Sequence, residues 1–256
     1  MNDEAAALGT VTWVQQTLGR LSPAERRSLL APLARTHVRN AIGRLRMFVH
    51  LHPGRHAYLP EGRLIAPDTV LTRAARRVAE QALPPTLFNH SSRTYRFGRA
   101  LGELEGIAVD TELLFAAAML HDTGLVVDPP ADADFTLASS RLARDVAEEV
   151  GLSPAATEVM QTAITMHYTP GVALTAGPEA YLLSAGAAVD VVGLRSWDLP
   201  ADTLKDAVRD YPRAQFKTYF SEAFRGEAAR VPQGRAQLLN RYGAFAAAIR
   251  FAPFAE

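Results

Sequence analysis

The residues best suited to chemistry in this chain are His121 and Asp122, which end an apolar run from Leu113 to Leu120. A helical segment that is apolar all round is buried on every side, so these two ionisable side chains should lie at or near the core. A buried carboxylate without a partner costs several kcal/mol, and coordination to a cation removes that penalty. The pair therefore indicates a metal site beside the last turn of a helix that ends at Gly124.

Three more polar residues stand on apolar helix faces. Asp190 lies within the run 185–192, where no residue of its own helix could neutralise it. His90 lies on the stripe that includes Leu87, Phe97 and Leu101, and His167 lies on a stripe with Met160 and Ile164. Taken singly, each histidine could be a hydrogen-bonded core histidine, and Asp190 could pair with a buried arginine. Taken together, His90, His121, Asp122 and Asp190 suit a metal site with coordination positions open for water.

Helix punctuation recurs along the whole sequence, and no segment alternates β-branched residues between hairpin turns. We therefore predict an all-α fold. Ser22-Pro23-Ala24-Glu25 is a capping box that opens a helix through the Leu29–Leu33 region, while Asn40 to Pro67 is punctuated by proline and glycine. Further helices are predicted at about 67–84, 86–105, 110–122, 134–150, 153–168, 178–194 and 200–210, with one or two after Pro212.

Composition limits the classes of function. The 256 residues contain no cysteine, which excludes disulfides, thiolate metal ligands and cysteine nucleophiles. Basic and acidic residues balance at 27 each, and no apolar run could span a bilayer, so we expect a cytoplasmic protein without nucleic-acid or membrane partners. Residues 1–66 form a locally basic extension and residues 67–256 the main domain. This extension and the apolar C-terminal tail could pack within one chain, or they could form the subunit interface of a homo-oligomer.

The ordered set His90, His121-Asp122, Asp190 resembles the HD superfamily of metal-dependent hydrolases over roughly residues 67–225. Within that superfamily, the chain looks most similar to the cyanamide hydratase branch. The motifs that carry this likeness are Asn89-His90-Ser91, Arg93, Tyr95, Phe97-Gly98, Leu120-His121-Asp122-Thr123-Gly124, Ala163-Ile164 with His167, Gly186 with Asp190-Val191 and Gly193, and Tyr211-Pro212-Arg213.

The resemblance implies an HD-type helical bundle in which His90, His121, Asp122 and Asp190 bind one divalent ion, with His167 in the second sphere. Zinc is expected first, and iron, manganese, cobalt and nickel suit the same ligands. Two departures from the patterns of other HD enzymes reduce the number of branches that suit this chain. Leu125 replaces the lysine that is common after Gly124 in cyclic-dinucleotide phosphodiesterases, and a single histidine between Asp122 and Asp190 favours one metal over two.

Two reactions suit such a site, and both begin with activated water. In a hydratase, water adds to a small nitrile-like substrate such as cyanamide, giving urea, and His167 supplies a proton. In the alternative, a phosphohydrolase, the substrate is a nucleoside monophosphate or another small phosphate ester, which needs cationic partners. Arg93, three residues after His90 on the same helix face, would clamp the anion, or would bind structurally to Asp190 or to a helix C-terminus.

A third possibility is a binding module that has lost catalysis. Asp128, Asp132 and Asp134, in the loop after the His-Asp pair, could position water or substrate, although loop and capping roles are commoner for aspartates there.

Overall fold

The computed structural model describes residues 6–126 and 132–256, and within these residues the chain is helical without a β-strand. The all-α prediction is confirmed. Asp128 lies outside the described residues. The helices are α1 (Val11–Thr17), α2 (Pro23–Phe48), α3 (Val70–Ala82), α4 (Pro85–Glu105), α5 (Thr111–Leu120), α6 (Phe135–Glu149), α7 (Pro154–Met166), α8 (Pro178–Val192), α9 (Ala201–Asp210), α10 (Phe216–Arg230), α11 (Arg235–Tyr242) and α12 (Phe245–Arg250).

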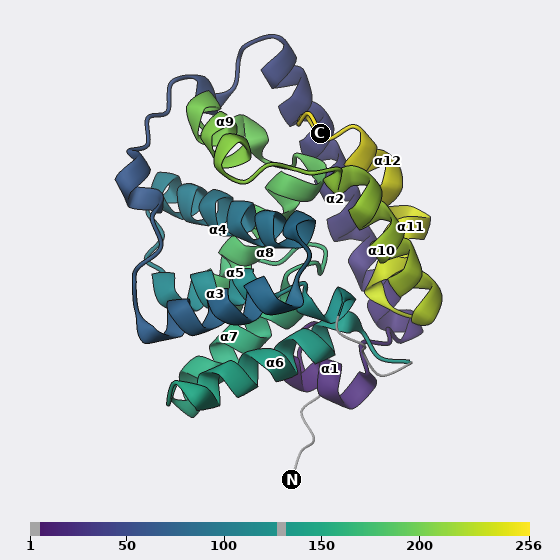
Figure 1. Cartoon of the computed structure of the whole chain (residues 1–256). Helices are drawn as coiled ribbons and strands as arrows, with labels where there is room; N and C mark the ends of the chain where they lie inside the picture. The colour runs from purple at the N-terminus through teal and green to yellow at the C-terminus, as the bar shows by residue number, and fades with distance from the viewer. Residues whose placement is uncertain (1–5, 127–131) are drawn as a thin grey trace.

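Helix α5 is the centre of the molecule. All of its residues from Leu113 to Leu120 are buried, as expected for a helix without a polar face. It contacts α3, α4, α6, α7 and α8, which surround it (Figure 1). His121 and Asp122 follow the last turn of α5, and burial on all sides therefore extends to them.

Helices α4 and α8 approach each other closely because glycines stand at their contact. A Cβ atom on Gly186 would lie 2.2 Å from the backbone oxygen of Thr94, and one on Gly98 would lie 2.6 Å from that of Leu182. Side chains larger than hydrogen would push the two helices apart. This contact brings the His90 face of α4 against the Asp190 face of α8.

The N-terminal helices lie on different parts of the body. Helix α1 contacts α6 and α7, whereas α2 contacts α11 and the 3₁₀ turn Ser196–Asp198. The capping box at Ser22 and Glu25 is present, as predicted. Helix α2 extends beyond the predicted Leu29–Leu33 region into the segment that starts at Asn40, and it ends at Phe48, before Pro53. The domain boundary at residue 66 stays a prediction.

Among the described residues, no helix combines the length and the apolar character that crossing a bilayer would require.

Candidate metal centre

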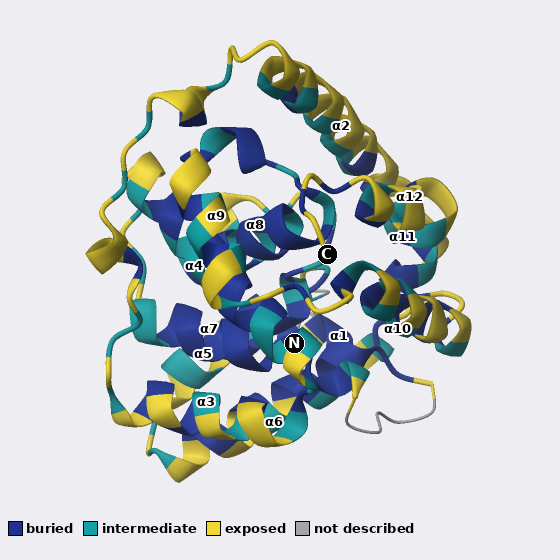
Figure 2. Ribbon diagram, turned by 45° about the horizontal axis from the view of Figure 1, so that its top comes forward, coloured by how far each residue is buried: buried dark blue, intermediate teal, exposed yellow. Residues whose placement is uncertain are grey.

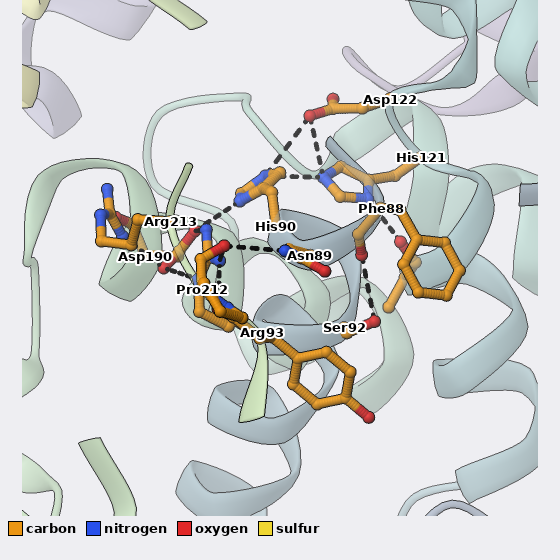
Figure 3. Close-up of polar contacts among 12 residues, drawn as sticks. Phe88, Asn89, His90, Ser92, Arg93, His121, Asp122, Asp190, Pro212 and Arg213 are labelled. Carbon is orange, nitrogen blue, oxygen red and sulfur yellow. Dashed lines mark hydrogen bonds and ion pairs between the residues drawn. The ribbon is translucent and has the colours of Figure 1, made fainter. Parts of the chain in front are cut away.

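Three buried side chains form a compact group in which one ion could be held. His90 lies on α4, His121 follows α5 directly, and Asp122 begins the 3₁₀ turn Thr123–Leu125. One potential ligand atom from each lies within 4.8 Å of the others. Nε2 of His90 is 3.3 Å from Nε2 of His121, and each of these atoms is 3.3 Å from Oδ2 of Asp122 (Figure 3).

The change of helix type after His121 lets two adjacent residues face one point. Residues of an α-helix that follow one another point about 100° apart. The chain leaves the α-helix after His121, and the tighter turn that begins at Asp122 packs against the start of α6. Gly124 allows this approach, since a Cβ atom there would lie 1.9 Å from the backbone oxygen of Phe135. The sequence-based prediction of an ion beside the last turn needs this geometry.

Hydrogen bonds at Nδ1 determine which ring nitrogen of each histidine faces the group. Nδ1 of His121 donates to the Ala118 carbonyl at 2.7 Å, and Nδ1 of His167 donates to the Ile164 carbonyl at 2.7 Å. A carbonyl only accepts, so in the neutral ring the proton is on Nδ1 and Nε2 carries a lone pair. Nδ1 of His90 donates in the same way to Asp190, at 2.7 Å from Oδ2. The Nε2 atoms are therefore the ones available as metal ligands.

The Asp122 carboxylate shows that a cation fits this place. Both of its oxygens are buried and neither accepts a hydrogen bond. Burial raises the pKa of Asp122, and that pKa falls well below its usual range only through positive charge at the neighbouring His121 and His90. A buried ionised carboxylate that faces imidazole lone pairs needs positive charge between them. A divalent ion bound by Nε2 of His90, Nε2 of His121 and Asp122 would supply it.

His167 faces the same carboxylate from the end of α7. Its Nε2 lies 3.7 Å from Oδ1 of Asp122, and its ring packs edge-on against His121 with centroids 4.7 Å apart. Burial, and next the neighbouring His121, lower the pKa of His167 to about 3. The structure thus brings His167 to the group, and its second-sphere role beside a metal ion stays a prediction.

Asp190 lies on the opposite side of His90, outside the three-residue group. Its carboxylate accepts from Nε and Nη2 of Arg93 at 2.7 and 2.8 Å and from Nη1 of Arg213 at 2.8 Å, besides the bond from His90 (Figure 3). Burial raises the pKa of Asp190, but Arg93, His90 and Arg213 lower it far below the usual range. Direct coordination by Asp190 stays a prediction, and it would require an oxygen to leave one of these partners.

Arg93 forms the structural salt bridge that was the alternative to an anion clamp. The side chain is fully buried, and Nη1 donates to the carbonyls of Tyr211 and Pro212 at 2.7 and 3.2 Å. With these bonds and its pair with Asp190, Arg93 already makes four hydrogen bonds within the protein. Its predicted role in binding substrate stays a prediction.

Sequence reasoning missed a second buried network behind His167. Asp134 caps α6 by accepting from the backbone N–H of Thr136, which is the commoner role expected for it, and it also accepts from Tyr168 and Arg235. Arg235, from α11, donates to the Thr165 carbonyl at 2.6 Å and so holds the end of α7. The available signal was Asp134 itself, but nothing in the sequence pairs it with an arginine about 100 residues away.

A cavity of about 150 Å³ lies beside His90, His121 and Asp122, the three residues that could hold an ion and that we call the metal-holding group. His90, His121, Asp122 and His167 line one part of it. The remaining lining is mainly apolar and comes from α2, α8, α10 and the C-terminal helices, with Phe220 and Phe224 among it. Among the described residues, no lysine or arginine lines the cavity.

A search of curated proteins found no match to this chain. A scan against family models matched residues 87–178 to the model described as HD domain. The matched segment includes His90, His121, Asp122 and His167 and ends before Asp190. This match supports the resemblance to the HD superfamily, whose members are generally metal-dependent hydrolases. The matched model describes the HD domain in general and does not distinguish the cyanamide hydratase branch from the others. Over residues 87–178, with a buried His-His-Asp group inside them, the chain is similar to the HD domain.

Proposed function

We propose that this protein is a metal-dependent enzyme that activates water for addition to a small neutral substrate, in the manner of a cyanamide hydratase. The observation that carries the proposal is the buried Asp122 carboxylate, which accepts no hydrogen bond and faces the Nε2 atoms of His90 and His121. Packing alone gives no reason to place these three groups together. One divalent ion, zinc or another first-row metal, would compensate the charge of the carboxylate and accept the lone pairs of the two imidazoles.

A bound divalent ion would supply a water molecule whose pKa falls from 15.7 towards about 7. Residues of the chain would hold the metal ligands and the attacking water in position. Asp190 orients His90 through Nδ1, and the Ala118 carbonyl orients His121 in the same way. His167 presents Nε2 towards Asp122, and because the pKa of His167 is lowered to about 3, this nitrogen is unprotonated at neutral pH and would accept a hydrogen bond from the attacking water.

The cavity supports a small neutral substrate. Its volume of about 150 Å³ is below the roughly 300–1,000 Å³ of pockets for drug-sized ligands. A phosphate ester needs cationic partners, yet no lysine or arginine among the described residues lines the cavity, and Arg93 is bound to Asp190. A nitrile-like molecule such as cyanamide needs no such partner. The chemistry of the lining therefore favours hydration over the phosphohydrolase alternative.

Product formation tests the proposal directly. Protein loaded with zinc, iron, manganese, cobalt or nickel is offered cyanamide and a panel of nucleoside monophosphates, and urea and free phosphate are measured. We expect urea from the wild type and none above background from Asp122→Ala. Asp202→Ala is the matched control, because the Asp202 side chain is 90% exposed and remote from the group.

Metal content and folding are measured beside activity. We expect Asp122→Ala to keep its helical circular dichroism while bound metal per chain falls, and Asp122→Asn serves if the alanine variant does not fold. Phosphate without urea would replace hydration with the phosphohydrolase alternative. A protein that binds no metal, and that loses stability rather than turnover in Asp122→Ala, would be a binding module instead.

A further inference from the structure

Three phenylalanine rings lead away from the metal-holding group along the cavity. The ring of Phe220 lies against His90 with centroids 5.6 Å apart, and Phe224 stacks on Phe220 with centroids 5.8 Å apart. Phe245, from α12, follows with its centroid 4.4 Å from that of Phe224. All three phenylalanines line the cavity, and we call them the aromatic wall. Figure 2 shows α10 and α12, which carry the wall, near each other and beside α8.

Helix α8 contributes small side chains to the same lining. Ser184, Ala187, Ala188 and Val191 follow one another at helical spacing, so they lie on one face of α8, and all four line the cavity. Larger side chains on this face would fill the space. The small ones therefore help to leave the volume of about 150 Å³ open.

Most of the lining offers no free hydrogen-bonding group away from the metal-holding group and His167. The hydroxyl groups of Thr36, Tyr168 and Thr169 are already bonded within the protein. Among the described residues, the other polar side chains of the lining are His37, Asn40 and Ser184. A ligand that reaches along the aromatic wall would therefore meet mainly carbon atoms.

The cavity has more apolar lining than cyanamide could use. In another protein, an apolar cavity of about 150 Å³ stays dry and takes up benzene. Cyanamide is much smaller than benzene and carries an amino group where other nitriles carry carbon, so it would leave the aromatic wall without a partner. Water would gain little there, because apolar surface offers it no hydrogen bonds. The lining therefore suits a ligand with a polar head at the metal-holding group and an apolar group beyond it.

We propose that the substrate is a nitrile whose apolar group, of roughly four to six carbon atoms, lies against the aromatic wall and α8. The nitrile head rests on the function proposed above, whereas the apolar group rests on the cavity alone. Hydration would join the oxygen of water to the nitrile carbon and place both hydrogens of that water on the nitrogen. The product is a primary amide, and no bond to the apolar group breaks.

Binding of the product amides tests the apolar group without turnover. Acetamide, butyramide and hexanamide are titrated into zinc-loaded protein by calorimetry. We expect the affinity to rise about fourfold for each added CH₂ group, because each one moves from water to an apolar site. Ala188→Leu fills the cavity and should bind hexanamide no more tightly than butyramide, and Ala188→Val serves if the leucine variant does not fold. Ala229→Leu is the matched control, because Ala229 is exposed on α10, and it should keep the wild-type rise.

Turnover of the matching nitriles tests the reaction separately. We expect kcat/KM of the wild type to increase from acetonitrile to hexanenitrile, and the ratio of the two values to fall at least about tenfold in Ala188→Leu. Val191→Ala widens the same part of the cavity, so it should move the preference towards octanenitrile. Opposite shifts in these two variants are not expected from a general loss of stability.

The two measurements separate failure of the apolar group from failure of the reaction. Equal affinities of the wild type for acetamide and hexanamide, or a full wild-type rise in Ala188→Leu, would overturn the apolar group. If urea still forms from cyanamide in that case, the proposed hydration stands with a different substrate. A rise in amide affinity that Ala188→Leu abolishes, without hydration of any nitrile, would support the apolar group and overturn the proposed reaction.

Discussion

The metal-holding group and helix α2 meet at one cavity, yet the chain stabilises them in different ways. Twelve of the 21 residues of α4, which carries His90, are buried, against three of the 26 residues of α2. The group is enclosed by α4, α5, α7 and α8, so its positions are determined within one chain. Helix α2 touches the body along a narrow strip. One side of the cavity is therefore held by many buried residues, and we call it the rigid side, whereas the other, the α2 side, is held by few.

The polar contacts on the two sides of the cavity also differ in how deeply they are buried. On the rigid side, Asp190 is bound by two buried arginines and by His90. Removal of one partner from such a pair leaves a buried charge without compensation. On the α2 side, Arg44 makes its bonds at the partly exposed edge of the molecule. Substitutions on the two sides should therefore act on different quantities, stability or metal affinity on one and substrate binding on the other.

The largest effect should come from the buried arginine of the rigid side. Arg93→Met removes a bidentate partner of Asp190, and we expect the free energy of unfolding to fall by about 3–5 kcal/mol. Arg209→Met is the control, because Arg209 pairs with Asp206 and Asp210 while its side chain is 63% exposed, and an exposed pair of this kind contributes little to stability. Urea unfolding followed by circular dichroism measures both. Equal losses in the two variants would contradict a structural role for Arg93.

Asp190→Asn should have a smaller effect, on metal affinity. Asparagine keeps an oxygen that can accept from Nδ1 of His90 but removes the negative charge. If Asp190 orients His90, affinity for zinc should fall by roughly 10–100-fold, as for other partners of metal ligands. Competition with a chelator measures it, and circular dichroism checks folding. A much larger loss would indicate that Asp190 coordinates the ion directly, as the sequence resemblance implies, and an unchanged affinity would contradict both roles.

Much of this arrangement is predictable from sequence, because it follows from local rules. The helices begin and end near capping residues, glycines and prolines, and His121 and Asp122 stand out because a run without a polar face precedes them. Asp190 was recognised as needing a partner from elsewhere. Its salt bridge with Arg93 was one of the roles expected for that arginine, whereas its partner Arg213 could not be derived, since the loop after α9 brings Arg213 to Asp190.

The extent of α2 was also beyond local rules. Asn40 and Gly43 are weak helix formers, and they indicate a break when read alone. In the structure Gly43 is needed inside the helix, because it lets α2 approach Trp197. A contact between residues more than 150 positions apart leaves no trace in the local pattern. Tertiary packing, rather than propensity, thus decides where α2 ends.

A matched pair of glycines compares the two sides of the cavity with the same change. A Cβ atom on Gly124 would lie 1.9 Å from the backbone oxygen of Phe135, and one on Gly43 would lie 2.2 Å from the Trp197 ring. Gly124→Ala should lower the free energy of unfolding by about 1–3 kcal/mol and weaken metal binding, because the rigid side cannot move away.

Gly43→Ala should lower the free energy of unfolding by less than about 1 kcal/mol, since α2 can shift outward at little cost in buried surface. Its effect should appear instead as a KM raised several-fold with metal content unchanged, because Asn40, which lines the cavity, moves with the helix. Urea unfolding, metal analysis and steady-state kinetics on both variants give the comparison. If Gly43→Ala destabilises the protein as much as Gly124→Ala does, α2 belongs to the rigid side, and the distinction between the two sides fails.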